Sequence, residues 1–211
     1  MGAPAATLIA LVTGPKVDHV SKRAESPPPG ASPEVLSLLD SEPGRVYIGA
    51  WRNIVFVVWQ AAATGPAVER LSRVSHTMKA QHPERVTYIH IIPDRAGLPT
   101  AEARSALITL MKELAQSIAS AAVVVGGTGF WASTMRSTIT GIRFLSPRAF
   151  ELRLHASVAE IVEWLPKAHR ERTGVAIAPT ELHRLLRLAE LWPSDADSAP
   201  PLWVAADSDH R

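Results

Sequence analysis

The chain of 211 residues contains no cysteine, and this absence excludes several kinds of chemistry. Without thiols there is no disulfide, no thiolate zinc site, no iron–sulfur cluster and no cysteine nucleophile. Histidine does not replace them, because no two of the eight histidines have the i, i+4 spacing of a helical metal site and no His-Glu-x-x-His motif occurs. The sequence therefore predicts neither a metal site nor a cofactor.

Long apolar runs are also missing. A membrane-spanning helix needs about 20 consecutive apolar residues, and the longest candidates, Leu8–Val12 and Ala121–Val125, are far shorter. No Lys or Arg precedes the first of these runs, so it lacks the basic region of a secretory signal. We therefore expect no membrane span and a cytoplasmic location.

Signatures of catalysis are absent as well. There is no Gly-x-Ser-x-Gly motif, which places the serine of many hydrolases on a strained turn. The few acids between residues 45 and 166 fall mostly on predicted helix faces, so no set of nucleophile, base and orienting group can be assembled. The sequence predicts a protein that is not an enzyme.

The composition, with 46% hydrophobic and 20% charged residues, is typical of a soluble chain with one folded domain. Prolines interrupt residues 1–44, which we interpret as a poorly ordered leader containing one short helix around Leu36, capped by Ser32. Residues 45–166 are predicted to form a core that folds alone. A helical extension (167–193) and a disordered tail (194–211) follow.

Within the core, apolar periodicity predicts alternating strands and helices. The predicted strands cover residues 45–51, 54–60, 86–92, 121–125 and 150–155, and the first two form a hairpin that turns at Arg52-Asn53, where Asn tolerates positive φ. The predicted helices cover 64–81, 100–120, 129–140, ended by Gly141, and 157–165, ended by Pro166. The order ββαβαβαβα predicts an α/β fold: a mixed, mostly parallel sheet with helices packed on it.

This pattern resembles a STAS domain, the module of sulfate transporters and anti-sigma-factor antagonists, and in particular bacterial single-domain STAS-like proteins. The likeness is carried by the hairpin Trp51–Trp59, the strand Val86–Ile92 with the helix after it, the stretch Ala122–Leu145 with its Thr-Gly-Ile turn, and the closing strand and helix Phe150–Leu165. The resemblance implies a regulatory module of the bacterial cytoplasm that works by binding another protein.

In anti-sigma-factor antagonists, an Asp-Ser-Ser-type motif with the switch serine follows the third strand and leads into the long helix. Here Asp94 stands at the acidic position, but Arg95 follows it and the first hydroxyl is Thr100. The serine switch is therefore not carried over. Loops at the carboxyl ends of parallel strands often bind partners, so we predict that Asp94, Arg95, Thr100 and Arg104 face a partner protein whose identity the sequence leaves open.

A glycine-rich turn offers a second, different site. Gly127, Thr128 and Gly129 lie between a strand and a helix, where backbone amides can bind an anion. The Lys-Ser/Thr of a P-loop is missing, and a tight turn that needs small residues is the alternative. Binding of a small ligand, whether an anion, a nucleotide or a lipid, is accordingly the alternative function.

Two other kinds of partner can be considered from the sequence. The arginines of the core are scattered singly, with no basic stripe, so nucleic acid is not expected. The helix predicted over residues 180–192 has a broad apolar face. We expect this face to pack on the core; docking on a partner or on a second copy, as in a homodimer, is the alternative.

Overall fold

The computed structural model describes residues 36–146 and 149–192. It contains six strands, β1 (Ser37–Glu42), β2 (Val46–Trp51), β3 (Ile54–Trp59), β4 (Val86–Ile92), β5 (Ile118–Val125) and β6 (Glu151–His155). Five helices accompany them, α1 (Gly65–Gln81), α2 (Ala101–Glu113), α3 (Gly129–Phe144), α4 (Val158–Thr173) and α5 (Pro179–Glu190). The predicted α/β class is confirmed.

The six strands form one mixed sheet in the order β1-β2-β3-β4-β5-β6. The pairs β1–β2 and β2–β3 are antiparallel, and β3 to β6 run parallel, each connected to the next by one helix. At the hairpin turn the positive φ falls on Arg52 (51°) and not on Asn53. Asn53 instead uses its side-chain amide to donate to the Arg85 carbonyl at 2.9 Å, which ties the turn to the start of β4.

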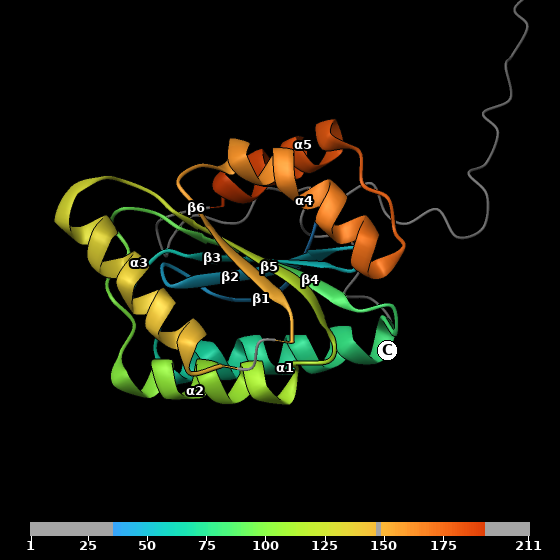
Figure 1. Ribbon diagram of the computed structural model, residues 1–211. Helices are drawn as coiled ribbons and strands as arrows, with labels where there is room; N and C mark the ends of the chain where they lie inside the picture. The colour runs from blue at the N-terminus through green and yellow to red at the C-terminus, as the bar shows by residue number, and fades with distance from the viewer. Residues whose placement is uncertain (1–35, 147–148, 193–211) are drawn as a thin grey trace, which may run out of the picture. The chain divides into compact units, whose positions relative to one another are not determined.

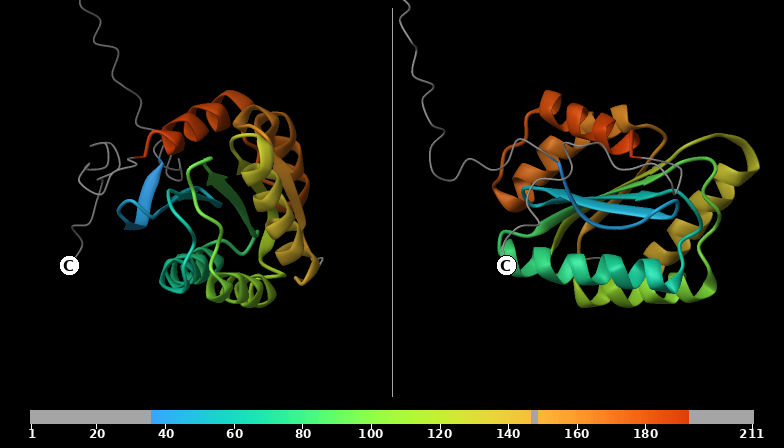
Figure 2. Two further views of the ribbon diagram at one scale, coloured as in Figure 1. Left: turned by 90° about the vertical axis from the view of Figure 1, so that its left-hand side faces the viewer. Right: turned by 180° about the vertical axis from the view of Figure 1, so that it is seen from behind.

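Helices cover both faces of the sheet, α1, α2 and α3 on one face and α4 and α5 on the other (Figures 1 and 2). Successive residues of a strand point to opposite faces, so β4 contributes to both cores. Tyr88 faces the side of α1 to α3, whereas Ile89 and Ile91 pack on the side of α4 and α5. Because both faces are covered, the central strands are predominantly apolar, as in other buried parallel sheets.

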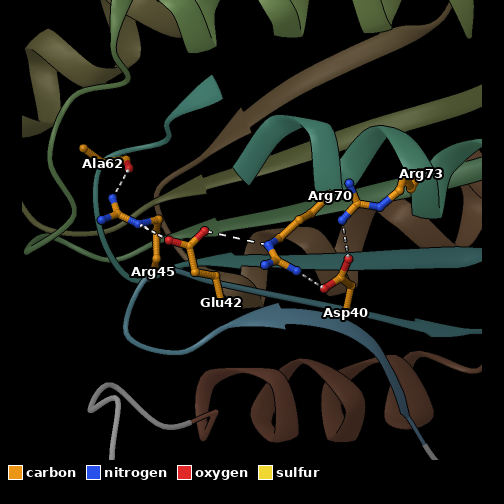
Figure 3. Close-up of polar contacts among 6 residues, drawn as sticks. All are labelled: Asp40, Glu42, Arg45, Ala62, Arg70 and Arg73. Carbon is orange, nitrogen blue, oxygen red and sulfur yellow. Dashed lines mark hydrogen bonds and ion pairs between the residues drawn. The ribbon is translucent and has the colours of Figure 1, made fainter. Parts of the chain in front are cut away.

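The short helix expected around Leu36 is wrong, because residues 37–42 form the edge strand β1. Asp40 and Glu42 lie two residues apart and therefore share one face of a strand, which they would not do in a helix. Both carboxylates reach Arg70 of α1, at 2.7 and 3.8 Å, and Asp40 also pairs with Arg73 at 3.3 Å (Figure 3). Leu36, just before the strand, is fully buried against the opposite core.

Several predicted helix ends are also wrong. The helix after Thr100 ends at Glu113, and the strand predicted from Ala121 begins at Ile118. Helix α3 continues through Gly141 to Phe144, and α4 continues through Pro166 to Thr173. Residues beyond each predicted end are buried, Ile142 in α3 and His169 in α4, so packing against the sheet overrides the helix-breaking tendency of glycine and proline.

The apolar face of α5 packs on the sheet, as expected. Leu182, Leu185 and Leu186 are completely buried, and Trp192 after the helix lies 6.0 Å from Tyr47 of β2, ring centre to ring centre. Most of the leader and the whole of the tail predicted for 194–211 lie outside the described residues. Within the described part, no helix is both long enough and apolar enough to cross a membrane.

Candidate ligand cavity

A cavity of about 120 Å³ lies between the sheet and helices α1, α2 and α3. Its walls come from β3, β4, β5 and β6 on one side and from the three helices on the other. They are almost wholly apolar; the larger side chains among them include Leu71, Leu107, Leu110, Met111, Leu114, Met135, Ile139 and Phe150. The cavity is therefore a partly open apolar space between the sheet and the helices, and its size is comparable to the roughly 150 Å³ of an engineered core cavity that binds benzene.

A few polar side chains interrupt the apolar lining, and they gather around β4. Trp59 of β3 donates a hydrogen bond from Nε1 to Nδ1 of His90, at 3.2 Å. The two rings lie almost parallel, at 6° with centres 6.4 Å apart, and Tyr88 stacks on the same imidazole at 6.3 Å. Ser75 of α1 also lines the cavity, with a buried hydroxyl that has no hydrogen-bond partner within the described residues.

These polar groups carry no charge at neutral pH. Burial lowers the pKa of His90 to about 4. By surface area the side chain is only half-buried, and we attribute its exposed part to the wall of the cavity, which His90 lines. Burial raises the pKa of Tyr88 to about 12, and the nearby Ser75 hydroxyl lowers it slightly, without a hydrogen bond of ordinary geometry. No Lys, Arg, Asp or Glu belongs to the lining. The site is suited to an uncharged ligand.

The loop predicted to face a partner forms one edge of this cavity. Ala96, Gly97 and Pro99 belong to the lining. The loop is fixed at two points: Trp131 of α3 donates from Nε1 to the Ala96 carbonyl at 2.9 Å, and the backbone amide of Thr100 donates to the carbonyl of Ala63 at 3.0 Å. The segment between β4 and α2 therefore forms one side of the cavity and is held in place by these two hydrogen bonds.

Three of the four predicted partner-binding residues belong to this loop and the fourth, Arg104, to the first turn of α2; none of them lines the cavity. Arg95 donates to the side-chain oxygen of Gln60 at 2.8 Å, and Arg104 donates to the Pro99 carbonyl at 2.8 Å. Thr100 caps α2, as predicted, by accepting a hydrogen bond from the Ala103 amide at 3.1 Å. Asp94 packs against the turn at Gly127. Three of the four thus support the loop and the start of α2.

The predicted anion site and the loop lie side by side. Gly127 and Gly129 both adopt positive φ, 74° and 77°, which accounts for glycine at these positions. A β-carbon on Gly127 would come within 2.7 Å of the Asp94 β-carbon, so the acidic side chain lies directly against the turn. Thr128 stands at the N-cap of α3 with a side chain that makes no capping bond. An acid at this place opposes a bound anion, and the tight-turn alternative fits better.

A second cluster of polar side chains is buried on the other face of the sheet. The Thr87 hydroxyl lies 2.8 Å from Nδ1 of His169 and 3.3 Å from the Ser120 hydroxyl. Burial lowers the pKa of His169 to about 4, while Glu84 raises it and Arg52 lowers it further. These groups bind one another, while Nε2 of His169 is buried without a hydrogen-bond partner within the described residues. Within residues 36–146 and 149–192, no group of three or more His, Asp or Glu side chains could hold a metal ion.

The cavity was not predicted from the sequence. The sequence predicts His90 to be a hydrogen-bonded structural residue, and the structure shows the hydrogen bond, from Trp59, without testing the role. The one sign of the cavity in the sequence is the placement of Tyr88 and His90 at alternate positions of a central strand. This spacing puts two rings that carry polar groups on the same buried face. That pattern alone does not predict whether the side chains on this face leave a cavity between them.

Comparisons with known proteins do not identify a family. No family model matches the chain, and no curated protein does. Among solved structures, one similar chain is the beta subunit of geranyl-CoA carboxylase from P. aeruginosa, at 13% identity with a TM-score of 0.37. That match covers 80% of this chain and 42% of the subunit, so this chain spans less than half of its length. Similarity at this level carries no argument about fold or function.

Proposed function

We propose that this chain is a non-catalytic binding domain that holds a small, uncharged, largely apolar molecule in the cavity between the sheet and α1 to α3. The observation that carries the proposal is the cavity itself, a partly open space of about 120 Å³ lined almost wholly by apolar side chains. Protein cores are normally close-packed, and apolar side chains that line an unfilled space lose packing contacts and the stability that these provide. A ligand that fills the space would restore that stability.

The lining also argues against the three ligand classes named from the sequence, an anion, a nucleotide and a lipid. An anion or a nucleotide requires cationic side chains or free backbone amides, and the lining supplies neither Lys nor Arg. A whole lipid is larger than the cavity. A molecule of about the size of one ring fits both the volume and the apolar walls.

A pair of neighbouring alanines provides the test. Ala121 of β5 lines the cavity, whereas Ala122 faces the opposite core. Ala121→Leu should fill the cavity, and Ala122→Leu should overpack a core without one and destabilise the fold by about 1–3 kcal/mol. Benzene serves as the probe, because it raises the melting temperature of a protein that binds it in the folded state.

Benzene is expected to raise the melting temperature of the wild-type chain and of Ala122→Leu, and to leave that of Ala121→Leu unchanged. No shift in the wild-type protein, or the same shift in wild type and Ala121→Leu, would contradict the proposal.

A second candidate function is the cytoplasmic regulatory role through protein binding that the STAS resemblance implies. It is favoured by two exposed apolar side chains near the predicted partner loop, Leu98 (42% exposed) and Phe130 (88% exposed). Phe130 precedes Trp131, whose indole bonds to Ala96 of that loop. Large exposed apolar side chains that lie near one another often mark interaction sites. The test is a pull-down from bacterial lysate with the wild type and with the double variant Leu98→Ser, Phe130→Ser. Proteins that bind only the wild type would be candidate partners; identical binding to the two proteins would contradict this role.

A further inference from the structure

The hydrogen bond between Trp59 and His90 determines where the imidazole carries its proton. An indole N–H can only donate, so Nδ1 of His90 must be the acceptor and bears no hydrogen. A neutral imidazole with an unprotonated Nδ1 carries its hydrogen on Nε2. His90 therefore presents one fixed hydrogen-bond donor at Nε2.

This donor is unused and accessible. Within the described residues, Nε2 of His90 has no hydrogen-bond partner, yet it is not among the polar atoms that are completely enclosed. His90 lies on a central strand whose face is covered by α1, α2 and α3, and its side chain lines the cavity. The accessible Nε2–H therefore faces the cavity. The Trp59 ring, stacked on the imidazole at 6°, fixes the direction of the donor.

An unpaired donor in an apolar space favours one kind of ligand. Leaving a buried N–H without a partner costs about 1–3 kcal/mol, which a ligand with an acceptor atom recovers and a pure hydrocarbon does not. A carboxylate would also accept this bond, but it would lose its hydration in a lining without a cation.

We propose that the ligand of this cavity is a neutral, ring-sized molecule bearing a hydrogen-bond acceptor such as a carbonyl oxygen, and that this oxygen accepts a hydrogen bond from Nε2–H of His90. The inference rests on the proposed function, since it names the class of ligand for the same cavity. In this account His90 selects the ligand, and Trp59 positions His90.

Two probes of nearly equal shape separate this inference from the proposed function. Cyclohexanone and methylenecyclohexane differ only in a carbonyl oxygen in place of a methylene group, and cyclohexanecarboxylate adds a charge. Binding of each to the full chain is measured by calorimetry, for the wild type and for His90→Phe, which removes the donor and keeps a ring. In parallel, the Nε2 resonance of His90 in the ¹⁵N-labelled wild type is followed by NMR.

Relative to His90→Phe, the wild type is expected to shift its preference toward cyclohexanone over methylenecyclohexane by about tenfold or more, the effect of at least one net hydrogen bond. Cyclohexanecarboxylate should bind most weakly. The Nε2 resonance should shift with cyclohexanone and not with methylenecyclohexane. In His90→Phe methylenecyclohexane should bind more tightly than cyclohexanone, because the carbonyl oxygen then loses its hydration without gaining a hydrogen bond. If that variant does not fold, the NMR shift in the wild type decides the question.

The same preference between the two neutral probes in wild type and His90→Phe, or no Nε2 shift with cyclohexanone, would overturn the assignment of the ligand class and leave the cavity as a binding site. Preferred binding of the carboxylate would also overturn the assignment. Failure of all the probes to bind would instead contradict the proposed function.

Discussion

The indole of Trp192 occupies the space that a side chain on Gly49 would need. A β-carbon on Gly49 would lie 2.7 Å from Cη2 of Trp192 and 2.7 Å from the backbone oxygen of Ser37. Gly49 thus lets the residue after α5 approach β2 closely, beside the edge strand β1. The amide of Gln60 also donates to the Trp192 carbonyl, at 3.3 Å. The C-terminal helix is therefore an integral part of the second core.

Gly49→Ala should lower the free energy of unfolding by about 1–3 kcal/mol, because the added methyl group forces Trp192 or β1 to move. The matched control is Gly141→Ala: Gly141 lies inside α3, where an added methyl group would meet nothing within 4 Å, and this variant should gain about 0.5–1 kcal/mol. Urea denaturation of both variants checks this. Equal effects of the two substitutions would contradict the close approach of Trp192.

The fragment 45–166 should not melt cooperatively, contrary to the expectation from the sequence. It lacks β1 and α5 and so uncovers the apolar face that includes Tyr47, Trp51 and Phe56, all buried in the whole chain. The fragment 36–192 contains every described element and should melt in one transition. Calorimetry on the two fragments tests this, and a cooperative transition of 45–166 near the temperature of the longer fragment would contradict it.

Stability should fall as the pH decreases from about 6.5 to about 4. The folded state holds His90 and His169 neutral with pKa values of about 4, against 6.5 for ordinary histidine. The unfolded chain therefore binds protons from about pH 6.5 downward, and the folded chain only near pH 4, so acid favours unfolding. Above pH 6.5 this loss is absent.

The contribution of His169 can be isolated by substitution. Between pH 7 and pH 4.5 it should account for about 2 kcal/mol of the lost stability, so the loss in wild type should exceed the loss in His169→Asn by that amount. Denaturation curves at the two pH values give both differences. The same loss in the two proteins would show that His169 is protonated as easily in the folded chain as in the unfolded one.

Asp40→Asn should weaken the attachment of β1 to the molecule. Asp40 is largely buried and pairs with both Arg70 and Arg73 (Figure 3), so its removal should cost about 1 kcal/mol. Glu171→Gln is the control, because the exposed Glu171 lies 4.0 Å from an exposed Lys167 and should contribute almost nothing. Amide exchange in β1 should accelerate in Asp40→Asn only; unchanged exchange would mean that the backbone pairing with β2 alone holds the strand.

The sequence predicted the fold well where one periodic signal dominates. The strand 86–92 agrees to the residue, and the N-caps of α1 and α2 lie at Thr64 and Thr100 as expected. The sequence-based prediction failed where packing between residues far apart in the sequence determines the structure. Pro166 favours a helix end locally, but Ala168 and His169 beyond it are buried, and α4 continues.

The candidate site was harder to predict, for a physical reason. Patterns of apolar residues show which side chains turn inward, but they do not show whether those side chains fill the space they enclose. Asp94 and Gly127 were each considered, yet only the structure places them in contact, where the acid opposes an anion. The bond from Trp59 to His90 joins residues 31 positions apart and has no signature in either segment.

The most direct test of the central claim is a crystal structure of the chain under xenon pressure. Xenon enters apolar core cavities large enough for it and is visible as a strong density peak. We expect one peak beside the His90 ring, between Leu110 and Phe150, in the wild type, and no such peak in Ala121→Leu. A wild-type crystal without xenon at this place, with side chains closed over the space, would contradict the account.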